Sequence, residues 1–384
     1  MARFDVGVIG AGVHGSSAAY HLASRGVRTV VFEREAPALG PTGRSSGICR
    51  AYYTNPFLAR MAWESIGMLR RFEDITAGHD AGFRETGFLF LQREEHREQV
   101  RDVLGRLMEV RIEVELLDRD ALAERFPRFD LNGVGFAVWE RHAGHADPAA
   151  TTMGFFGRAV ELGAEARLGR AVTAIRSREG EVVVETSDGT RTTCSRVLIT
   201  AGPWTAPLAR QLEVELPLTV ERHVVAMFRW GSAEPVVAHA DIEAGYYFRP
   251  EGSQLFLMGS LHPAPQVDPD SFPQEVAASE ALDLSEPLVR RVPHLAEAEP
   301  HGGWASLYDV SPDWQPVIGE VAPGVFVDAG TSGHGFKLAP ALGRRVAELV
   351  TGEAVDPDLR QFDPFRFERG AELSAGFGRS RIVG

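Results

Sequence analysis

The chain has 384 residues, of which 44% are hydrophobic and 24% are charged, the usual composition of a soluble globular protein. This length accommodates about two domains with a substantial core. The formal net charge of -13 argues against a nucleic-acid partner and against an anionic membrane surface, because an acidic protein surface repels phosphate groups.

Two cysteines, Cys49 and Cys194, occur without a CxxC pattern, so we expect no dependence on disulfides and a reducing compartment. No basic N-terminal region precedes a cleavable apolar stretch. No apolar run approaches the roughly 18 residues that a membrane span requires. These patterns predict a cytoplasmic protein without integral membrane association.

A glycine-rich turn near the N-terminus follows a short apolar strand, residues 6–9, and precedes a helix expected over residues 16–25. Gly10 permits the tight turn, Gly12 lets the backbone approach a pyrophosphate, and Gly15 lets the helix pack on the strand. The free amides and positive dipole of the helix N-terminus favour phosphate groups. The pattern predicts a dinucleotide site.

A second apolar strand, residues 30–32, ends in Glu33, which at this place accepts hydrogen bonds from an adenosine ribose and repels a 2′-phosphate. The motif alone leaves open whether the dinucleotide is FAD or NAD. The next loop, residues 38–50, holds Arg44 and Arg50 among glycines and hydroxyl residues. This combination is typical of a loop that wraps a phosphate or a flavin edge.

The middle of the chain alternates helices and strands. The expected helices cover residues 55–72, 93–109 and 149–162, and the expected strands cover residues 88–91, 182–186 and 190–194. His142, His145 and Asp147 lie close together in sequence, which makes a metal site an alternative here. No further ligand cluster accompanies them, and a Gly–Pro turn explains their spacing, so we predict no metal.

An apolar strand starting at residue 196 ends in the turn Ala201-Gly202-Pro203-Trp204, where a doubly wound sheet meets its ligand. Strands are then expected over 216–230, 245–250 and 254–259, with an acidic helix over 273–292. This block indicates an antiparallel sheet with helices, built from insertions into the first domain.

A last strand, residues 325–327, runs into a turn with Gly333 and Gly335 directly before a helix. The apolar stripe of this helix is Leu338, Leu342, Val346 and Leu349. The turn is a second helix start suited to an anion. Two such starts predict one long ligand held at both ends.

Six motifs in this order and spacing resemble the D-amino-acid-oxidase-like flavoenzymes, particularly the branch of sarcosine oxidase and dimethylglycine dehydrogenase. The motifs are Gly10-Ala11-Gly12-Val13-His14-Gly15 with Glu33, Gly43-Arg44-Ser45-Ser46-Gly47, Gly144-His145-Ala146-Asp147-Pro148, Ala201-Gly202-Pro203-Trp204, Asp309-Val310-Ser311-Pro312-Asp313 and Gly333-His334-Gly335-Phe336-Lys337. The resemblance covers the chain from about residue 4 to Phe362-Asp363-Pro364.

The resemblance implies FAD, with the flavin edge near Gly333 to Lys337 and the adenine end near Glu33. The cofactor-binding residues predicted from the motifs and the resemblance together are Gly10, Ala11, Gly12, Val13, His14, Gly15, Glu33, Arg34, Gly43, Arg44, Ser45, Ser46, Val172, Ala201, Gly202, Trp204, Gly333, His334, Gly335, Phe336 and Lys337.

The resemblance also implies a substrate that carries an amine and a carboxylate. Arg50 and Lys337 match the two cations that hold the carboxylate, and Tyr247 and His262 fall near the family's tyrosine and histidine at the substrate. A core aromatic remains the alternative interpretation of Tyr247. The implied chemistry is oxidation of a C–N bond by hydride transfer to flavin N5, which gives an imine that water hydrolyses.

Three departures from the family pattern carry predictions. Ser306 stands where monomeric sarcosine oxidases tether FAD through a cysteine, and Arg44 stands where the dehydrogenases use a histidine. We therefore predict non-covalent FAD. The stretch 255–259 lacks the lysine that helps the oxidases react with oxygen, which weakens the oxidase interpretation; Lys337 and Arg222 are the candidate replacements.

The predicted fold class is α/β (α+β): a Rossmann-type FAD-binding domain with a discontinuous antiparallel-sheet substrate domain. The FAD-binding domain is expected over 1–86, 146–215 and 310–372, and the substrate domain over 87–145 and 216–309. Residues 373–384, rich in glycine and serine, are expected to form a flexible tail.

The leading functional prediction is oxidation of a small secondary amine or amino acid of the N-methyl or imino acid type. The alternatives are a D-amino-acid dehydrogenase or oxidase, a flavin monooxygenase, an NAD-linked dehydrogenase, and a flavin-binding subunit of a larger oxidoreductase complex. Arg50 and Lys337 favour an active enzyme. The exact substrate, the electron acceptor (oxygen or another molecule) and the oligomeric state stay open.

Overall fold

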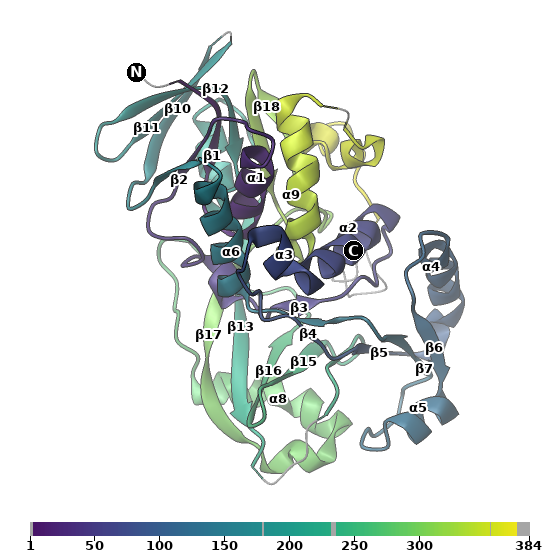
Figure 1. The fold of residues 1–384 in the computed structure, drawn as a ribbon. Coiled ribbons are helices and arrows are strands. Elements are labelled where there is room, and N and C mark those ends of the chain that lie inside the picture. Colours follow the sequence, from purple (N-terminus) through teal and green to yellow (C-terminus); the bar gives the residue numbers. More distant parts are fainter. Residues whose placement is uncertain (1–2, 179, 232–235, 354, 375–384) are drawn as a thin grey trace.

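The computed structural model describes residues 3–178, 180–231, 236–353 and 355–374. Two large sheets organise these residues, and in the view of Figure 1 the first sheet with its helices lies above the second. A short three-stranded sheet lies between them, formed by β3 (Ile48–Cys49), β8 (Gly144–His145) and β4 (Arg84–Glu85).

The centre of the first sheet is parallel. Its central strands are apolar and buried, as is usual in parallel sheets, whose faces are covered by helices. Its strands are β1 (Arg3–Ile9), β2 (Thr29–Phe32), β9 (Glu165–Arg167), β10 (Val172–Arg178), β11 (Glu181–Thr186), β12 (Arg191–Ile199), β18 (Val317–Ala322) and β19 (Val325–Ala329). The strands β9, β2, β1, β12 and β19 pair in parallel in this order, while β11, β10 and β18 add antiparallel pairings. The carboxyl ends of the parallel strands therefore meet at one edge, where ligands bind in such sheets.

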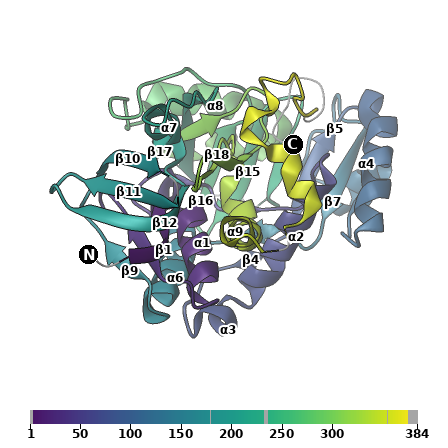
Figure 2. The same ribbon diagram turned by 90° about the horizontal axis from the view of Figure 1, so that it is seen from above.

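Helices cover this sheet. Helix α1 (Val13–Ala23) packs between α6 (Pro148–Glu161) and α9 (Gly335–Thr351), and α2 (Pro56–Arg70) packs on α9. Figure 2 shows α1, α6 and α9 together beside β1 and β12. Two shorter helices, α3 (Phe72–Thr76) and α7 (Thr205–Arg210), follow α2 and β12. The apolar face of α1 is buried through Ala18, Ala19 and Leu22, as the sequence predicted.

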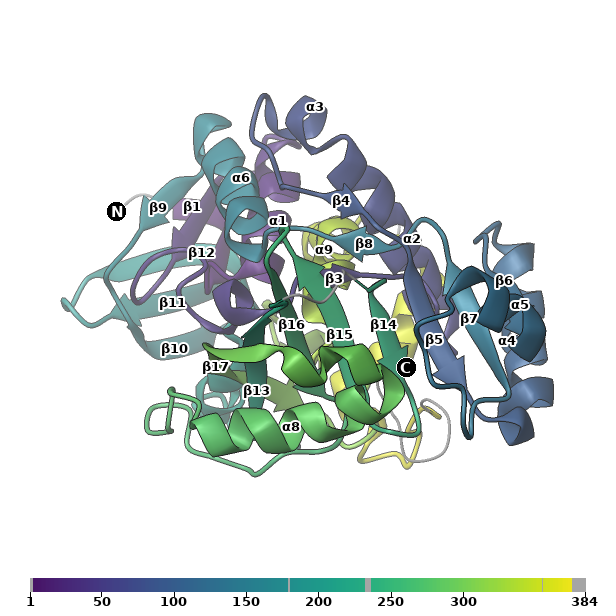
Figure 3. The same cartoon turned by 90° about the horizontal axis from the view of Figure 1, so that it is seen from below.

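The second sheet has the order β17-β13-β16-β15-β14-β5-β7-β6. Its strands are β5 (Phe88–Gln92), β6 (Glu115–Asp118), β7 (Phe136–Glu140), β13 (Thr219–Arg229), β14 (His239–Asp241), β15 (Tyr246–Glu251), β16 (Leu255–Ser260) and β17 (Glu299–Val310). Figure 3 shows α8 (Ala278–Arg291) lying across one face, with α5 (Arg119–Arg125) and α4 (Arg97–Glu109) near β6 and β7.

The two faces of this sheet have different partners, because successive side chains of a strand point to opposite faces. On β15, Tyr246 and Phe248 join the apolar cluster beneath α8, whereas Tyr247 joins the core that also contains α1, α2 and α9. The face that carries Tyr247 is therefore turned toward the dinucleotide-binding region.

The mixed α/β class is confirmed, with one difference in the second sheet. Strand β14 pairs with β5 in parallel, whereas the other pairings of this sheet are antiparallel. This pairing joins the segments 87–145 and 216–309, which supply the strands of this sheet, except that β17 runs one residue further, to Val310. The parallel pairing of β14 with β5 could not be predicted, because it joins segments far apart in the sequence and no local sequence pattern indicates it.

Most predicted elements lie close to their expected bounds, but α1 begins at Val13 instead of Ser16, and the strands expected over 190–194 and from 196 form one strand, β12. The helix expected over 55–72 is α2, where the Asn55 side chain accepts from the Phe57 and Leu58 amides, followed by α3. The acidic helix expected over 273–292 begins later, as α8 at Ala278. Within the described residues, no helix is long and apolar enough to cross a membrane. Most of the predicted tail, residues 375–384, lies outside the described residues.

Candidate active site

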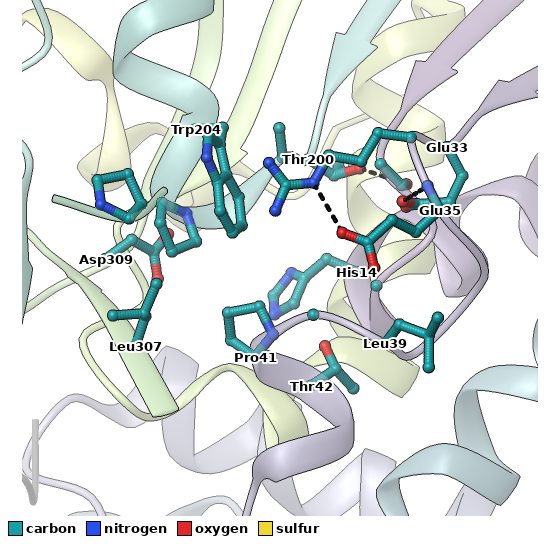
Figure 4. A pocket seen from close by; sticks show the side chains of 18 of the residues that line it. His14, Glu33, Glu35, Leu39, Pro41, Thr42, Thr200, Trp204, Leu307 and Asp309 are labelled. Carbon is teal, nitrogen blue, oxygen red and sulfur yellow. Dashed lines mark hydrogen bonds and ion pairs between the residues drawn. The ribbon is translucent and has the colours of Figure 1, made fainter. Parts of the chain in front are cut away.

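A long groove follows the carboxyl ends of β1, β2 and β12 and continues to the start of α9. Its volume is about 1160 Å³, larger than the roughly 300–1,000 Å³ of a typical drug-sized ligand site. Figure 4 shows Glu33, His14, Pro41, Thr42 and Trp204 arranged around the open space. The predicted cofactor residues that line the groove are Gly10, Gly12, Val13, His14, Glu33, Arg34, Arg44, Ser45, Val172, Ala201, Gly202, Trp204, Gly333, Gly335 and Phe336.

The remaining predicted cofactor residues do not line the groove. They are Ala11, Gly15, Gly43, Ser46, His334 and Lys337. A Cβ on Gly15 would overlap the Gly10 carbonyl oxygen and come within 2.5 Å of Thr200 Oγ1. Gly10 has φ +102°, a conformation that favours glycine. The first turn is therefore as tight as the sequence predicted.

Glu33 closes the adenine end of the groove. Its carboxylate accepts hydrogen bonds from the Ala11 amide at 2.8 Å and from the Glu35 amide at 2.9 Å. Beside it, the Arg34 guanidinium stacks on the Trp204 ring, 3.7 Å from the ring centroid. These contacts fix the carboxylate at the place where the sequence predicts the ribose.

The turn before α9 closes the other end. His14 Nδ1 lies 2.8 Å from Asp328 Oδ2, and His14 Nε2 lies 3.1 Å from the Gly335 carbonyl oxygen. Burial lowers the pKa of His14, but the Asp328 and Asp309 carboxylates raise it by more, so the pKa is raised overall. This histidine ties the first turn of α1 to the start of α9.

The groove fits FAD on three grounds. It is long enough to join two helix starts, and neither Gly12 nor His334, the two N-cap residues, supplies a side-chain cap. Amides at such starts are suited to phosphate oxygens. Glu33 offers the carboxylate that a ribose needs. These residues would hold the adenosine, the pyrophosphate and the approach to the flavin.

A strap, residues 269–274 between β16 and α8, lines the same groove. Asp270 Oδ1 accepts hydrogen bonds from Trp204 Nε1 at 2.8 Å and from Arg34 Nη1 at 3.2 Å. Gln274 Oε1 accepts a hydrogen bond from Arg44 Nη2 at 2.7 Å. The strap thus contacts three residues predicted to hold the cofactor, Arg34, Arg44 and Trp204.

We expect Asp270→Ala to release FAD about three- to tenfold faster than wild type, because each exposed hydrogen bond contributes roughly 0.5–1.5 kcal/mol. The measurement is the rise of flavin fluorescence after dilution of the holoprotein. Asp283→Ala, which removes an exposed carboxylate on α8, is the control and should leave the release rate unchanged. Equal rates for wild type and Asp270→Ala would show that the strap does not retain FAD.

Next to the α9 end of the groove lies a buried pair of cations, Arg50 and Lys337. Arg50 is 4% exposed and Lys337 is 7% exposed. Arg50 donates to the Tyr52 carbonyl at 2.6 Å, and its guanidinium lies 4.4 Å from the centroid of the Tyr53 ring. Within the described residues, no carboxylate lies within ion-pair distance of Lys337. The pair therefore offers a positive site for an anion.

The electrostatics of this pair are unusual. Burial and the nearby Arg50 lower the pKa of Lys337 to about 7, and the same burial, with Lys337 and Arg50, lowers the pKa of His334 well below its ordinary range. Neither ring nitrogen of His334 has a hydrogen-bond partner among the described residues. Lys337 is also the only lysine of the chain, and the other residues in the total of 40 lysines and arginines are all arginines.

Tyr247 and His262 differ in their placement. The Tyr247 hydroxyl interacts electrostatically with the side chains of Ser46 and Tyr308, and the Tyr308 ring lies directly against Gly333. Tyr247 is thereby linked to the α9 turn. His262 is exposed on the surface with its ring over Gly245. The structure thus brings Tyr247, but not His262, into contact with residues of the groove.

The histidine and acid cluster has structural roles. Asp147 caps α6 by accepting from the Ala149 and Ala150 amides. His142 pairs with Glu85 at 2.8 Å. Over the described ranges, no group of three possible ligands is placed to hold a metal ion.

The sequence reasoning missed Glu140, Tyr308 and Asp270. Glu140 is completely buried, at the end of the otherwise apolar strand β7. An acid that ends such an apolar strand is a signal available in the sequence, as is a single lysine among many arginines. Asp270 lies in a loop without any local pattern, so only the folded chain shows its contacts.

A dinucleotide groove that ends beside a buried pair of cations defines this protein as an oxidoreductase of the dinucleotide-binding class. Residues 5–349 match the family described as DAO, FAD dependent oxidoreductase. The chain belongs to this family, is an enzyme, and has FAD as its cofactor.

Individual relatives cover nearly the whole chain. Human peroxisomal sarcosine oxidase is 30% identical, with 96% of this chain and 97% of the relative covered. Monomeric sarcosine oxidase of Bacillus sp. (strain NS-129) is 27% identical, with 94% and 96% covered. The crystal structure of L-proline dehydrogenase from P. horikoshii has a TM-score of 0.85 at 24% identity, covering 96% of this chain and 98% of that one, and this likeness shows the fold.

Proposed function

We propose that the protein oxidises the C–N bond of a small amino acid with a secondary amine, of the N-methyl or imino acid type, giving an imine that water hydrolyses. The observation that carries this proposal is the buried pair Arg50 and Lys337, in which Lys337 has no carboxylate within ion-pair distance among the described residues. The similarity to two sarcosine oxidases supports an N-methyl amino acid as substrate.

The two cations perform two tasks in this proposal. They hold the substrate carboxylate by charge-assisted hydrogen bonds, and this fixes the adjacent C–H bond in one orientation. They also disfavour a protonated amine in the same buried site, because like charges repel in low dielectric. The neutral amine is the form that can lose hydride. His262, which was predicted to favour this form, is exposed, so the two cations take its place.

FAD, when bound, supplies the acceptor of the hydride. The residues that would hold it are those of the groove, with Glu33 at the ribose and the starts of α1 and α9 at the phosphates and the flavin. Burial around Tyr53, Tyr247 and His334 excludes water from the reacting carbon.

The direct test is anaerobic bleaching of the flavin absorbance by candidate substrates. We expect bleaching by N-methyl amino acids or cyclic imino acids, and none by the same amines without a carboxylate. Bleaching by D-amino acids alone would favour the alternative activity. No bleaching by any amine or imino acid would contradict the proposal and favour a flavin-binding subunit of a larger complex.

The electron acceptor is open between oxygen and another molecule. Arg222 was a candidate for assisting oxygen, but it donates to Glu280 Oε1 at 2.6 Å and to the Glu275 carbonyl at 3.0 Å. Its charge is therefore neutralised, and Lys337 remains as the candidate. Mixing the reduced enzyme with oxygen separates the two cases, since an oxidase regains its flavin spectrum quickly and releases peroxide.

Non-covalent FAD is a further part of the proposal. Ser306 lines the groove and is 4% exposed, and its hydroxyl cannot form the thioether that a cysteine would. We expect acid precipitation to leave the yellow colour in the supernatant. A yellow pellet after washing would show a covalent bond and contradict this prediction.

The division into domains 1–86, 146–215 and 310–372 against 87–145 and 216–309 is also proposed, because the two large sheets draw their strands from these segments. A cytoplasmic location is proposed because both cysteines, Cys49 and Cys194, are free and buried, which suits a reducing compartment.

A further inference from the structure

Glu140 is a completely buried acid that the proposed reaction does not use directly. It ends β7, and its carboxylate accepts hydrogen bonds from the amide of Ala51 and, at 3.1 Å, from the amide of Tyr52. Both amides belong to the segment directly after Arg50, 88 to 89 residues away in the sequence. Strand β7 of the second sheet thus fixes, through Glu140, the backbone that follows Arg50.

The segment that Glu140 holds needs such an acceptor. Residues 50–53 follow β3 without regular secondary structure, and Ala51, Tyr52 and Tyr53 are completely buried. Buried backbone amides outside helices and sheets must find a partner, since an unpaired amide costs about 1–3 kcal/mol. Because Arg50 donates to the Tyr52 carbonyl, the position of its guanidinium depends on this backbone.

Glu140 also places a negative charge beside both cations. Burial raises the pKa of Glu140; the Ala51 and Tyr52 amides and the charges of Arg50 and Lys337 act to lower it, but the pKa is raised overall. The pKa of Lys337 is in turn affected by Glu140. Burial and Arg50 lower this pKa, whereas the Glu140 charge raises it.

We propose that Glu140 is a positioning residue of the Arg50–Lys337 site: it fixes the backbone behind Arg50 and places its carboxyl group near the two cations. This inference rests on the proposed function, since it assumes that the two cations receive a carboxylate. A residue with a merely structural role would fix the backbone without affecting the protonation of Lys337.

The single lysine of the chain makes the test direct. Holoenzyme labelled with ¹⁵N or ¹³C in lysine gives one side-chain signal, which reports the titration of Lys337. Its other ionisable neighbours, Arg50, Cys49 and His334, are unchanged in the variants. In wild type we expect a midpoint near pH 7. In Glu140→Gln we expect a midpoint at least half a unit lower, because the opposite charge is gone.

Two variants serve as controls. Glu140→Asp keeps the charge but reaches the amides less well, so we expect a nearly wild-type midpoint with weaker binding of propanoate, a carboxylate without an amine. Glu64→Gln removes an acid of α2 that pairs with Arg344 and should change neither property. If Glu140→Gln does not accumulate as holoenzyme, Glu140→Asp decides alone: wild-type propanoate affinity would contradict the inference.

The outcomes separate the inference from the proposed function. If propanoate does not perturb the lysine signal of wild type at any pH, the Arg50–Lys337 site does not bind carboxylates and the proposed function fails. If propanoate perturbs it but Glu140→Gln titrates like wild type and only unfolds more easily, Glu140 is structural and the inference alone fails.

Discussion

Lys337→Met is expected to weaken binding of the carboxylate substrate by about ten- to a hundredfold, because it removes a buried charge-assisted hydrogen bond worth roughly 1.5–3 kcal/mol. Methionine has a similar length and no charge. Turnover should fall as well, since a carboxylate held by Arg50 alone can pivot. Anaerobic flavin reduction at increasing substrate concentration gives the apparent Kd and the limiting rate of reduction separately.

The pH dependence offers an independent check. Lys337 has its pKa lowered to about 7, so it is protonated below this pH and neutral above it. Because a carboxylate binds best to the protonated form, we expect propanoate affinity in wild type to fall as the pH rises above 7, until it approaches the affinity of Lys337→Met. This dependence should be absent in Lys337→Met. Propanoate avoids the titration of a substrate amine, which would otherwise oppose the trend.

Lys337→Arg is the matched control for charge. Arginine keeps a cation that does not titrate near neutral pH, so propanoate binding should lose its pH dependence while the affinity stays above that of Lys337→Met. If Lys337→Met binds and oxidises substrate like wild type, the assignment of Lys337 to the carboxylate is wrong. Loss of flavin from this variant would place Lys337 at the cofactor instead.

The dinucleotide groove could be predicted from the sequence because its signals are local. The turn at Gly10 to Gly15, the acid at Glu33 and the second turn at Gly333 each lie beside a strand and a helix whose periodicity is visible. The tight turn is confirmed, α1 begins at Val13, three residues before the start that the sequence predicted, and the family match confirms FAD. Each of these features needs only a few neighbouring residues.

The site beside the groove could be predicted only through the family resemblance. Arg50 and Lys337 are 287 positions apart, and nothing in the local pattern of either residue pairs them. His262 shows the limit of this approach: the loosely matching stretch placed it at the substrate, but it lies exposed over Gly245. Alignment with the family identifies which residue matches a position, whereas the orientation of its side chain depends on the local backbone.

The contacts between the two sheets could not be predicted from either source. Glu140 reaches the amides after Arg50, and Asp270 reaches Arg34 and Trp204, across pairs of segments that only the complete fold brings together. Exposed and buried acids also look alike in a single sequence. A buried acid at the end of an apolar strand, as in residues 136–140, is the sign that deserves a search for its partner.

Gly15→Ala is expected to weaken FAD binding by about ten- to a hundredfold. The added Cβ would overlap the Gly10 carbonyl oxygen and approach Thr200 Oγ1 to 2.5 Å, so the turn must open. Overpacking of this kind costs roughly 1–3 kcal/mol. The amides that face the phosphates belong to the same turn, so the displacement reaches the cofactor directly. Flavin content after purification and titration of the apoprotein with FAD measure the effect.

Gly67→Ala, in the last turn of α2, is the matched control. A Cβ at Gly67 meets no atom within 4 Å, and alanine is the better helix former by up to about 1 kcal/mol. This variant should keep wild-type FAD affinity and unfold at the same temperature or higher. Thermal unfolding of both apoproteins separates a damaged cofactor turn from a damaged fold. If Gly15→Ala retains wild-type FAD content and affinity, the close packing of α1 on β1 is not what shapes the phosphate site.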